Sequence, residues 1–484
     1  MQSIKNKRLI RTGSFIAGHW HNSDAALNVY NPATGQLLAT VSNAGTEQAI
    51  VAVDKAYAAQ KLWATRTAGE RSELLMAWHD AILQNIDDLA RILTLEQGKP
   101  LAQAKGEVAY GASYVKWFAE EALRVYGDTI PAPSGDKRIV VLKQPVGVVG
   151  AITPWNFPNA MMVRKAAAAM AAGCTFVVKP SEETPLSALA VAALAQQAGI
   201  PDGVLSVVVS EDAQGIGEVL TTHPHISKFS FTGSTGVGKK LLAQCANGVK
   251  RTSMELGGNA PFIVMEDADQ AAALSGLMSA KFRNAGQTCV CPNRVFIHRS
   301  IYDNFADKLQ NKLGTLTIGP GLNDEVDIGP LINEKATSKI KALVERSLAM
   351  GAKVLYTLSA PLDGCYYPPT IMVNVNNQMP IARTEIFGPV ATLIPFDSEQ
   401  EVVELANDTE YGLAAYLYTR DVGRIFRMSE ALAFGMVAIN EGVVSNAASP
   451  FGGVKASGHG REGSKYGLDD YLNIKSLCLG GIDA

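Results

Sequence analysis

The sequence predicts an α/β protein with two Rossmann-like parallel-sheet domains and a protruding β-ribbon. Apolar strand-like segments alternate with helical segments from residue 146 onward, which is typical of a parallel sheet. The chain has 484 residues, too many for one compact core, so more than one domain is expected. A polar tip at residues 134–137 separates two extended arms and indicates a hairpin that stands away from the domains.

The N-terminal part is predicted to change from strands to helices. Residues 14–41 have the turn residues of short strands, and a helix with Thr46 as its cap follows. Further helices are expected over 68–84 and 86–97, the second ending at Gly98. A longer helix then carries aromatic residues that its spacing assigns to a core or interface rather than to a cofactor, namely Tyr110, Tyr114, Trp117 and Phe118.

The first parallel sheet is expected to come from four strand–helix units. Its helices are predicted over residues 158–172, 184–198, 212–221 and 236–246. The dinucleotide fingerprint G-x-G-x-x-G is absent, because Gly215-Ile-Gly217 lacks a third glycine. The helix after Thr232, Gly233 and Ser234 could still hold a pyrophosphate on its free N–H groups, or it is a plain capped helix.

Composition excludes several classes of function. A net charge of −3 gives no polycationic surface, so neither nucleic acid nor an acidic membrane is implied as a partner. Six scattered cysteines have neither a disulfide-framework nor a zinc spacing, so no metal is expected, and they favour a reducing compartment. No secretory signal and no membrane-spanning apolar run are visible, so a cytoplasmic location is expected.

Cys289 is the strongest candidate for chemistry. It lies in KFRNAGQTCVCPNR, residues 281–294, among small and amide-bearing residues with arginines nearby, a setting that suits a reactive thiol. Local composition alone favours an ordinary buried cysteine. Upstream, Glu255 stands before a Gly-Gly pair in MELGGNAP, where a lone carboxylate is usually a strand-end residue. Asn156 lies between two prolines in TPWNFP and would otherwise be read as a turn residue.

Together these three motifs resemble the aldehyde dehydrogenase superfamily, and the resemblance extends from the N-terminus to the last strand. It implies that the thiolate of Cys289 adds to an aldehyde while Asn156 stabilises the oxyanion. Hydride transfer to a nicotinamide would then leave a thioester, and Glu255 would activate the water that hydrolyses it. Because Glu255 is present, hydrolysis is favoured over acyl transfer to coenzyme A.

The resemblance also implies the cofactor, NAD or NADP, and the residues that bind it. Lys179 and Glu182 follow a strand and match the positions that hold the adenosine ribose, and Glu182 favours NAD because its carboxylate would repel the 2′-phosphate of NADP. Glu385 and Phe387 match the EIFGP motif at the nicotinamide ribose. The full expected set is Trp155, Lys179, Glu182, Thr232, Gly233, Ser234, Leu256, Glu385 and Phe387.

Three further residues resemble the succinate-semialdehyde dehydrogenase branch. Arg164, Arg283 and Ser445 match positions that hold the substrate's distal carboxylate, for which an arginine fork is well suited. Arg164 taken alone is more readily a helix-face residue paired with an acid. The branch often has Gly-Pro where this chain has alanines at 167–169, so the helix could sit differently. Succinate semialdehyde is the expected substrate, with glutarate and 2-oxoglutarate semialdehyde as alternatives.

The domain boundaries are predicted from the same resemblance. Residues 1–122 and 146–253 are expected to form the nucleotide-binding domain and 254–450 the catalytic domain. Residues 123–145 and 451–484 are expected to form the arm that builds a homo-oligomer, a dimer or a tetramer, as such ribbons do in this superfamily.

Other readings of the chain stay open at this point. An inactive structural or binding relative is disfavoured because all three catalytic positions are retained. A cofactor-free thiol hydrolase lacks a histidine in a matching motif. Cys291 could close a redox-sensitive disulfide with Cys289 or could be a small packing residue, and a spacing of one residue makes the required geometry difficult.

Overall fold

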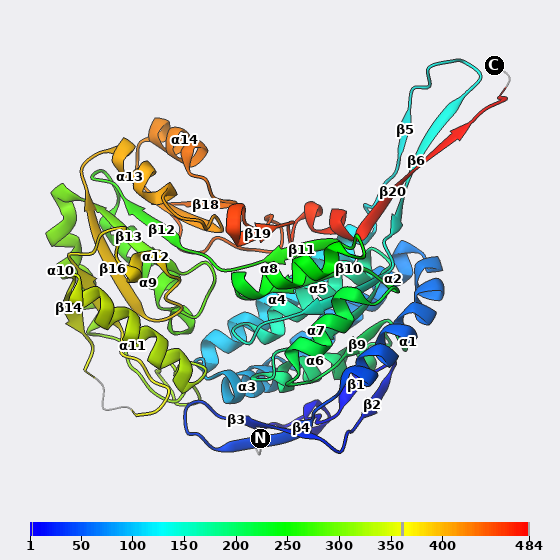
Figure 1. Ribbon diagram of the computed structural model, residues 1–484, viewed down its shortest axis with the longest axis horizontal. Coiled ribbons are helices and arrows are strands. Elements are labelled where there is room, and N and C mark those ends of the chain that lie inside the picture. The colour runs from blue at the N-terminus through cyan, green and yellow to red at the C-terminus, as the bar shows by residue number, and fades with distance from the viewer. Residues whose placement is uncertain (2, 360–362, 483–484) are drawn as a thin grey trace.

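The computed structural model describes residues 1, 3–359 and 363–482, so the last two residues of the expected arm lie outside the description. Two sheets lie side by side, and a ribbon projects from the first of them (Figure 1). This is the predicted fold class, two parallel α/β units with a β-ribbon arm. Among the described residues, no helix has both the length and the apolar character needed to cross a bilayer.

The first sheet has eight strands in the order β19-β11-β10-β7-β8-β9-β1-β2. Five neighbouring strands are parallel, and the edge strands pair antiparallel. The strands are β1 (Ser14–Ile16), β2 (His19–His21), β7 (Val148–Ile152), β8 (Thr175–Lys179), β9 (Leu205–Val207), β10 (Ile226–Thr232), β11 (Arg251–Glu255) and β19 (Gly458–His459).

Helices cover both faces of this sheet because its strands are apolar on both sides. Along β7, Val149 faces the larger core and Val148 the smaller one, as alternation requires. The larger core contains α2 (Ala68–Gln84), α3 (Ile86–Gln97), α4 (Leu101–Ala122), α5 (Pro158–Ala171) and α6 (Pro185–Gln197). The smaller core contains α1 (Thr46–Thr65), α7 (Ala213–Thr222) and α8 (Thr235–Ala246).

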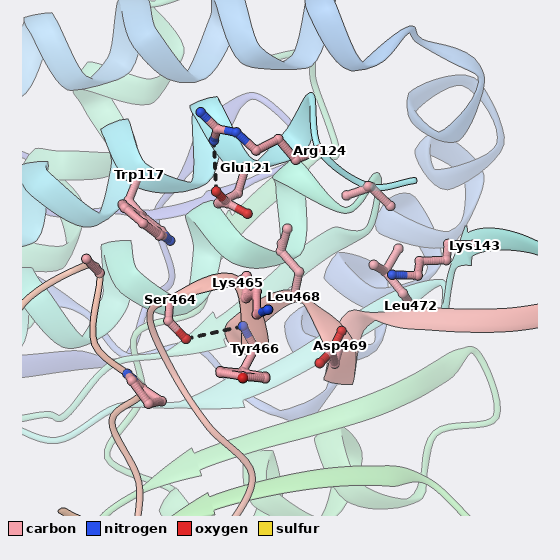
Figure 2. Close-up of a pocket in the computed structure, with 13 residues that line it drawn as sticks. Trp117, Glu121, Arg124, Lys143, Ser464, Lys465, Tyr466, Leu468, Asp469 and Leu472 are labelled. Atoms are coloured by element: carbon pink, nitrogen blue, oxygen red, sulfur yellow. Dashed lines mark hydrogen bonds and ion pairs between the residues drawn. The ribbon is translucent and has the colours of Figure 1, made fainter. Parts of the chain in front are cut away.

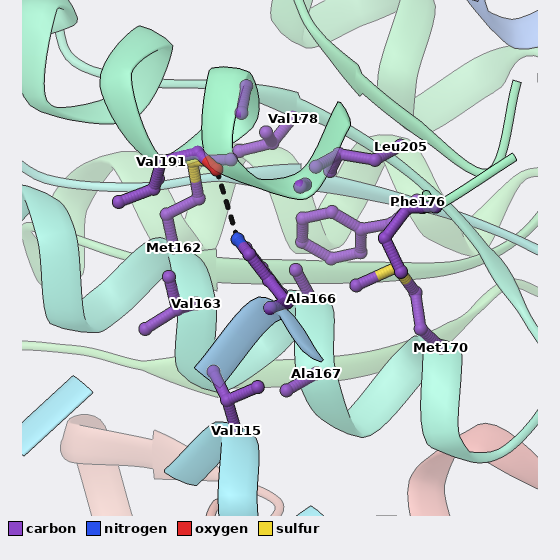
Figure 3. Packing of buried hydrophobic residues seen from close by; sticks show 14 of the residues in the cluster. Val115, Met162, Val163, Ala166, Ala167, Met170, Phe176, Val178, Val191 and Leu205 are labelled. Atoms are coloured by element: carbon purple, nitrogen blue, oxygen red, sulfur yellow. Dashed lines mark hydrogen bonds between the residues drawn. The ribbon is translucent and has the colours of Figure 1, made fainter. Parts of the chain in front are cut away.

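Helix α5 lies at the centre of the larger core, and every one of its residues is buried. Figure 3 shows Met162, Ala166 and Met170 of α5 among Phe176 and Val178 of β8. The alanines at 167–169 continue this helix without interruption, so the departure from Gly-Pro does not break it. Small side chains let α5 pack closely on both α4 and the sheet.

Most predicted helix boundaries hold within one residue, and α2 and α3 match the expected ranges. Gly98 ends α3 with φ +95°, the left-handed conformation that glycine tolerates. The expected cap of α1 is wrong by one residue. Gly45 is the N-cap, Thr46 is the first helical residue, and the Gln48 side chain accepts the Gly45 N–H at 2.9 Å.

The second sheet has seven strands in the order β14-β15-β16-β13-β12-β17-β18, all parallel except β14 at one edge. The strands are β12 (Ala260–Val264), β13 (Pro292–His298), β14 (Lys353–Thr357), β15 (Thr370–Val373), β16 (Val390–Phe396), β17 (Ala414–Tyr418) and β18 (Met436–Ile439). The helices are α9 (Gln270–Lys281), α10 (Tyr302–Leu313), α11 (Glu334–Ala349), α12 (Pro380–Arg383), α13 (Glu399–Asn407) and α14 (Val422–Ala431).

Two smaller sheets complete the fold. β3 (Ala26–Tyr30) pairs with β4 (Leu37–Ser42), and the projecting arm is formed by β5 (Asp128–Ile130), β6 (Arg138–Pro145) and β20 (Leu472–Leu479) (Figure 1). β20 pairs antiparallel with all eight residues of β6, as expected of the terminal strand. Within 451–484, however, β19 joins the first sheet, so only part of that range lies in the arm. The domain boundaries themselves remain a prediction.

Candidate active site

The site lies where the carboxyl ends of the first sheet meet the amino ends of the second. β7, β10 and β11 end just before or at Asn156, Ser234 and Glu255. In the other sheet, Cys289 precedes β13, and Glu385 precedes β16. Because neighbouring parallel strands end at a common edge, segments far apart in the sequence converge here.

The Cys289 loop is held by close backbone contacts. Asn284 and Ala285 both have φ +52°, and Gly286 has φ +74°, so three consecutive residues adopt the left-handed conformation. A Cβ on Gly286 would lie 2.3 Å from the carbonyl oxygen of Gly388. A Cβ on Gly258 would lie 2.3 Å from the carbonyl oxygen of Cys289. Gly258 of the MELGG motif and Gly286 of the Cys289 loop therefore have to be glycine for the MELGG and EIFGP segments to approach this loop so closely.

A pocket of about 250 Å³ opens onto Cys289. Nine residues that the sequence singled out line it, and Trp155 and Phe387 meet there edge to face at 5.5 Å between ring centroids. The nine are Trp155, Asn156, Thr232, Gly233, Ser234, Leu256, Cys289, Glu385 and Phe387. Sequence reasoning missed Pro154, Gly257, Ala336, Lys339 and Ile386.

The polar groups of this pocket fit a nicotinamide dinucleotide. The hydroxyl oxygen of Thr232 is buried without a hydrogen-bond partner, and α8 begins directly after Ser234 with its free N–H groups. Glu385 accepts the Gly258 N–H at 3.0 Å, while burial raises the pKa of its carboxyl to about 7. Lys339 donates to the backbone oxygen of Glu385 at 2.9 Å and so fixes the EIFGP segment.

Lys179 and Glu182 lie apart from this pocket. Lys179 is buried at the end of β8 and forms an ion pair with Glu182 at 3.0 Å. Glu182 lines a cavity of about 760 Å³ beside the β3–β4 hairpin and the start of α11. The two residues therefore meet each other outside the pocket at Cys289, and their contact with an adenosine ribose stays a prediction.

Asn156 is fixed in orientation by hydrogen bonds at both ends. Its side-chain Nδ2 donates to the backbone oxygen of Gln287 at 3.0 Å, which leaves the second amide hydrogen for another acceptor. Its own backbone oxygen accepts from Lys99 Nζ at 2.8 Å and from Asn284 Nδ2 at 3.0 Å. An amide donor held in this way can stabilise an oxyanion without reorganising.

Glu255 and Cys289 both hold their protons tightly. Glu255 is buried, neither carboxylate oxygen has a hydrogen-bond partner, and desolvation and the nearby Glu462 raise its pKa well above the usual range. Burial, together with the nearby Glu385 and Glu255, raises the pKa of the Cys289 thiol to about 12. A raised pKa makes the Glu255 carboxylate a stronger base, so the pair suits proton transfer.

A second pocket, of about 180 Å³, lies beyond Asn156 and Phe157. Arg283 and Ser445, two of the three residues expected to hold a carboxylate, both line it. The remaining lining residues are Lys99, Gln103, Gly106, Glu107, Tyr110, Phe157, Asn284 and Val443. Tyr110 packs against the larger core, as its helical spacing predicts, and also lines this pocket, while Tyr114 and Phe118 belong to the core itself.

Arg164 does not take the expected place beside Arg283. It lies behind Tyr110 with 1% exposure, and its Nη2 pairs with Glu462 at 2.5 Å. Glu462 also binds Lys165, so one carboxylate serves two buried cations. The structure therefore does not place Arg164 and Arg283 as a clamp of two arginines. Arg164 is instead paired with an acid, Glu462, which is the alternative expected for a residue on a helix face.

Cys291 is buried with its sulfur 3.5 Å from the backbone oxygen of Lys281. All six cysteines are free thiols. Whether Cys291 pairs with Cys289 under oxidant stays a prediction.

The geometry agrees with the comparison with known proteins. The sequence profile described as "Aldehyde dehydrogenase family" matches residues 20–477. The chain belongs to the aldehyde dehydrogenase family and is an NAD(P)-dependent oxidoreductase.

Several individual members of the family are similar to this chain over almost its full length. The chain is 54% identical to the 3-sulfolactaldehyde dehydrogenase of Pseudomonas putida, over 100% of both chains. It is 51% identical to the glutarate-semialdehyde dehydrogenase of Pseudomonas aeruginosa, over 99% of this chain and 100% of the relative. The Escherichia coli succinate-semialdehyde dehydrogenase (NADP) is also 51% identical, over 99% of each. A solved structure described as an E. coli NADP-dependent enzyme superposes with a TM-score of 0.98 at 50% identity, over 99% of this chain and 100% of that one.

The raised pKa of Glu255 predicts how stability depends on pH. The folded protein binds this proton more tightly than the unfolded chain, whose glutamates titrate near pH ~4.3. Stability is therefore lost as pH rises from that value toward the raised folded pKa. Glu255→Gln has no such proton, so its free energy of unfolding should fall less than that of wild type as pH rises above about 4.3.

Denaturant unfolding at several pH values measures this difference. Glu345→Gln, at an exposed position of α11, is the matched control and should follow the wild-type profile. Parallel pH profiles for wild type and Glu255→Gln would contradict the assignment of a buried, protonated Glu255.

Proposed function

We propose that the protein oxidises a short aldehyde with an anionic group at its far end, most simply succinate semialdehyde to succinate, using NAD or NADP. One observation carries this proposal. The cofactor-type pocket at Cys289 and the pocket with Arg283 and Ser445 are lined by neighbouring residues of the same two segments, Asn156–Phe157 and 283–289. An aldehyde at Cys289 can therefore direct a short anionic tail toward Arg283.

The reaction begins at the Cys289 thiol. The thiol first loses its proton to water. The sulfur then adds to the aldehyde carbon, the C=O π bond breaks, and the carbonyl oxygen becomes an oxyanion. Asn156 Nδ2, oriented by Gln287, donates to this oxyanion together with the backbone N–H of Cys289. The bound nicotinamide supplies the acceptor for the hydride that the carbon loses, which leaves an acyl thioester on Cys289.

Glu255 completes the cycle as a base. It takes a proton from water, the hydroxide attacks the thioester carbon, and the Cys289 sulfur leaves, so the products are a carboxylic acid and the free enzyme. Among the described residues, neither carboxylate oxygen of Glu255 has a hydrogen-bond partner, so both are available to accept from a water molecule. Its raised pKa means that this step should accelerate as pH rises.

A second candidate is an aldehyde whose distal group is a sulfonate. A relative with 54% identity is named for 3-sulfolactaldehyde, and others with 51% identity are named for glutarate or succinate semialdehyde. These aldehydes share a distal anion, which an arginine and a hydroxyl group can bind in either chemical form. A panel of carboxylate and sulfonate aldehydes decides the order of preference.

The arm supports assembly into a homo-oligomer, either a dimer or a tetramer. β20 exposes the apolar residues Ile474, Leu477 and Leu479 along the ribbon. At its base, a groove of about 630 Å³ runs between α4 and residues 464–472, where Figure 2 shows Trp117, Tyr466 and the Glu121–Arg124 pair. Exposed strands and apolar grooves of this kind favour a second copy of the chain as the partner. The free thiols favour a reducing, cytoplasmic environment.

The roles of the catalytic pair predict distinct defects. Cys289→Ala should abolish turnover because the acyl group has no attachment point. Glu255→Gln should release NADH in one burst, equal to the enzyme concentration, and then stall as a thioester. Rapid-mixing absorbance with succinate semialdehyde measures the burst, and steady turnover of Glu255→Gln at the native rate would contradict the role of base.

The anion pocket predicts selective loss on removal of Arg283. A hydrogen bond to a charged group contributes about 1.5–3 kcal/mol, so Arg283→Met should lower kcat/KM for succinate semialdehyde roughly tenfold to a hundredfold. Butanal, a neutral aldehyde of the same length, should be nearly unaffected because it lacks the charge. Equal losses on both substrates would mean that Arg283 supports the fold of the Cys289 loop instead.

Glu182 predicts a preference for NAD over NADP. Its carboxylate can accept hydrogen bonds from ribose hydroxyl groups and would repel a 2′-phosphate, although its ion pair with Lys179 reduces the repulsion. Glu182→Ser should therefore raise kcat/KM for NADP relative to NAD. Steady-state kinetics with both cofactors tests this, and a wild-type enzyme that already prefers NADP would contradict the assignment.

A further inference from the structure

A chain of side-chain contacts connects the buried Arg164 to the wall of the second pocket. Arg164 Nη1 donates to the Tyr110 hydroxyl at 3.4 Å, and that hydroxyl group donates to Ser445 Oγ at 3.0 Å. Tyr110 and Ser445 line the pocket together with Arg283, whereas Arg164 lies behind them. Tyr110 thus stands between a buried cation and the hydroxyl group expected to meet the substrate.

Arg164 is held too firmly to reach the pocket itself. Glu462 pairs with its Nη2, and its guanidinium lies over the rings of Phe451 and Tyr114, at 4.5 Å and 5.5 Å from their centroids. Moving the side chain would leave Glu462 short of one of its two cations in a buried environment, which is strongly unfavourable. Any effect of Arg164 on a bound anion is therefore transmitted through neighbouring groups.

The donors and acceptors along this chain have a defined direction. A guanidinium can only donate, so the Tyr110 oxygen accepts from Arg164. The Tyr114 hydroxyl lies 2.9 Å from the Tyr110 hydroxyl, and with Tyr114 as the donor in that bond Tyr110 directs its own proton to Ser445. Ser445 then accepts from Tyr110 and keeps its own hydrogen free for the pocket. An anion bound in the pocket would accept from Ser445 and so extend the chain of hydrogen bonds that begins at the Arg164 guanidinium. Hydrogen bonds aligned in this way polarise one another.

Resting on the proposed function, we propose that Tyr110 is a positioning residue that orients Ser445 as a donor to the substrate's distal anion. Tyr110 acts through Ser445, because its single proton is already committed. It makes the pocket selective for aldehydes with a terminal anion, since a neutral chain end gains nothing from an oriented donor. This role belongs to the hydroxyl group, while the ring packs edge-on against Tyr114 at 5.0 Å.

Tyr110→Phe tests the relay because it removes the hydroxyl group and keeps the ring. The variant should raise KM for succinate semialdehyde about fivefold to tenfold and leave kcat nearly unchanged, since one oriented hydrogen bond to an anion is weakened. KM for butanal should stay at the wild-type value. Tyr302→Phe is the matched control: its hydroxyl group donates to the backbone oxygen of Leu393 at 3.3 Å, outside this pocket, and the variant should keep the wild-type KM for both substrates.

A double-mutant cycle shows whether Tyr110 acts through Ser445. If it does, Tyr110→Phe combined with Ser445→Ala should have the same KM for succinate semialdehyde as Ser445→Ala alone. Multiplying effects would overturn the relay, and so would equal effects of Tyr110→Phe on the charged and neutral aldehydes. If the proposed function itself is wrong, the result differs: Arg283→Met would then lower kcat/KM for succinate semialdehyde and for butanal by the same factor.

Discussion

The site depends on a close backbone contact between the Cys289 loop and the two loops on either side of it. Gly258 and Gly286 each occupy positions where a Cβ would lie 2.3 Å from a carbonyl oxygen of the neighbouring loop. These contacts leave no room for adjustment, so the thiol, the MELGG loop and the EIFGP loop form one unit. The arrangement requires residues 284–286 to adopt the left-handed conformation, which is unfavourable for Asn284 and Ala285. In this conformation the Asn284 side chain donates to the backbone oxygen of Asn156.

A second constraint is the buried charge behind Glu255. Glu462 binds both Arg164 and Lys165, and its negative charge adds to desolvation in raising the pKa of Glu255. The same carboxylate holds Arg164 away from the pocket of Arg283 and Ser445, so Arg283 is the arginine among the lining residues described there. One buried acid thus influences both the strength of the base and the way in which the substrate's anion is held.

Much of the cofactor-type pocket could be predicted from the sequence, because its residues lie in short motifs whose spacing identifies them. Ala336 and Lys339 could not, since they lie on a helix whose pattern predicts only a solvated face. Arg164 and Tyr110 show a different limit. Their helical positions were visible, but the partner of Arg164 is a glutamate 298 residues away, and Tyr110 meets a serine 335 residues away. Contacts at such separations are created by the tertiary fold, and local periodicity does not report them.

The central claim is that an aldehyde bound at Cys289 extends its distal anion into the pocket formed by Arg283 and Ser445. The most direct measurement is a crystal structure of Cys289→Ala with succinate semialdehyde and NAD, a complex that cannot form the thioester. We expect the carbonyl oxygen within hydrogen-bond distance of Asn156 Nδ2 and the carboxylate between Arg283 and Ser445. A carboxylate directed to solvent or into the cofactor pocket would contradict the account.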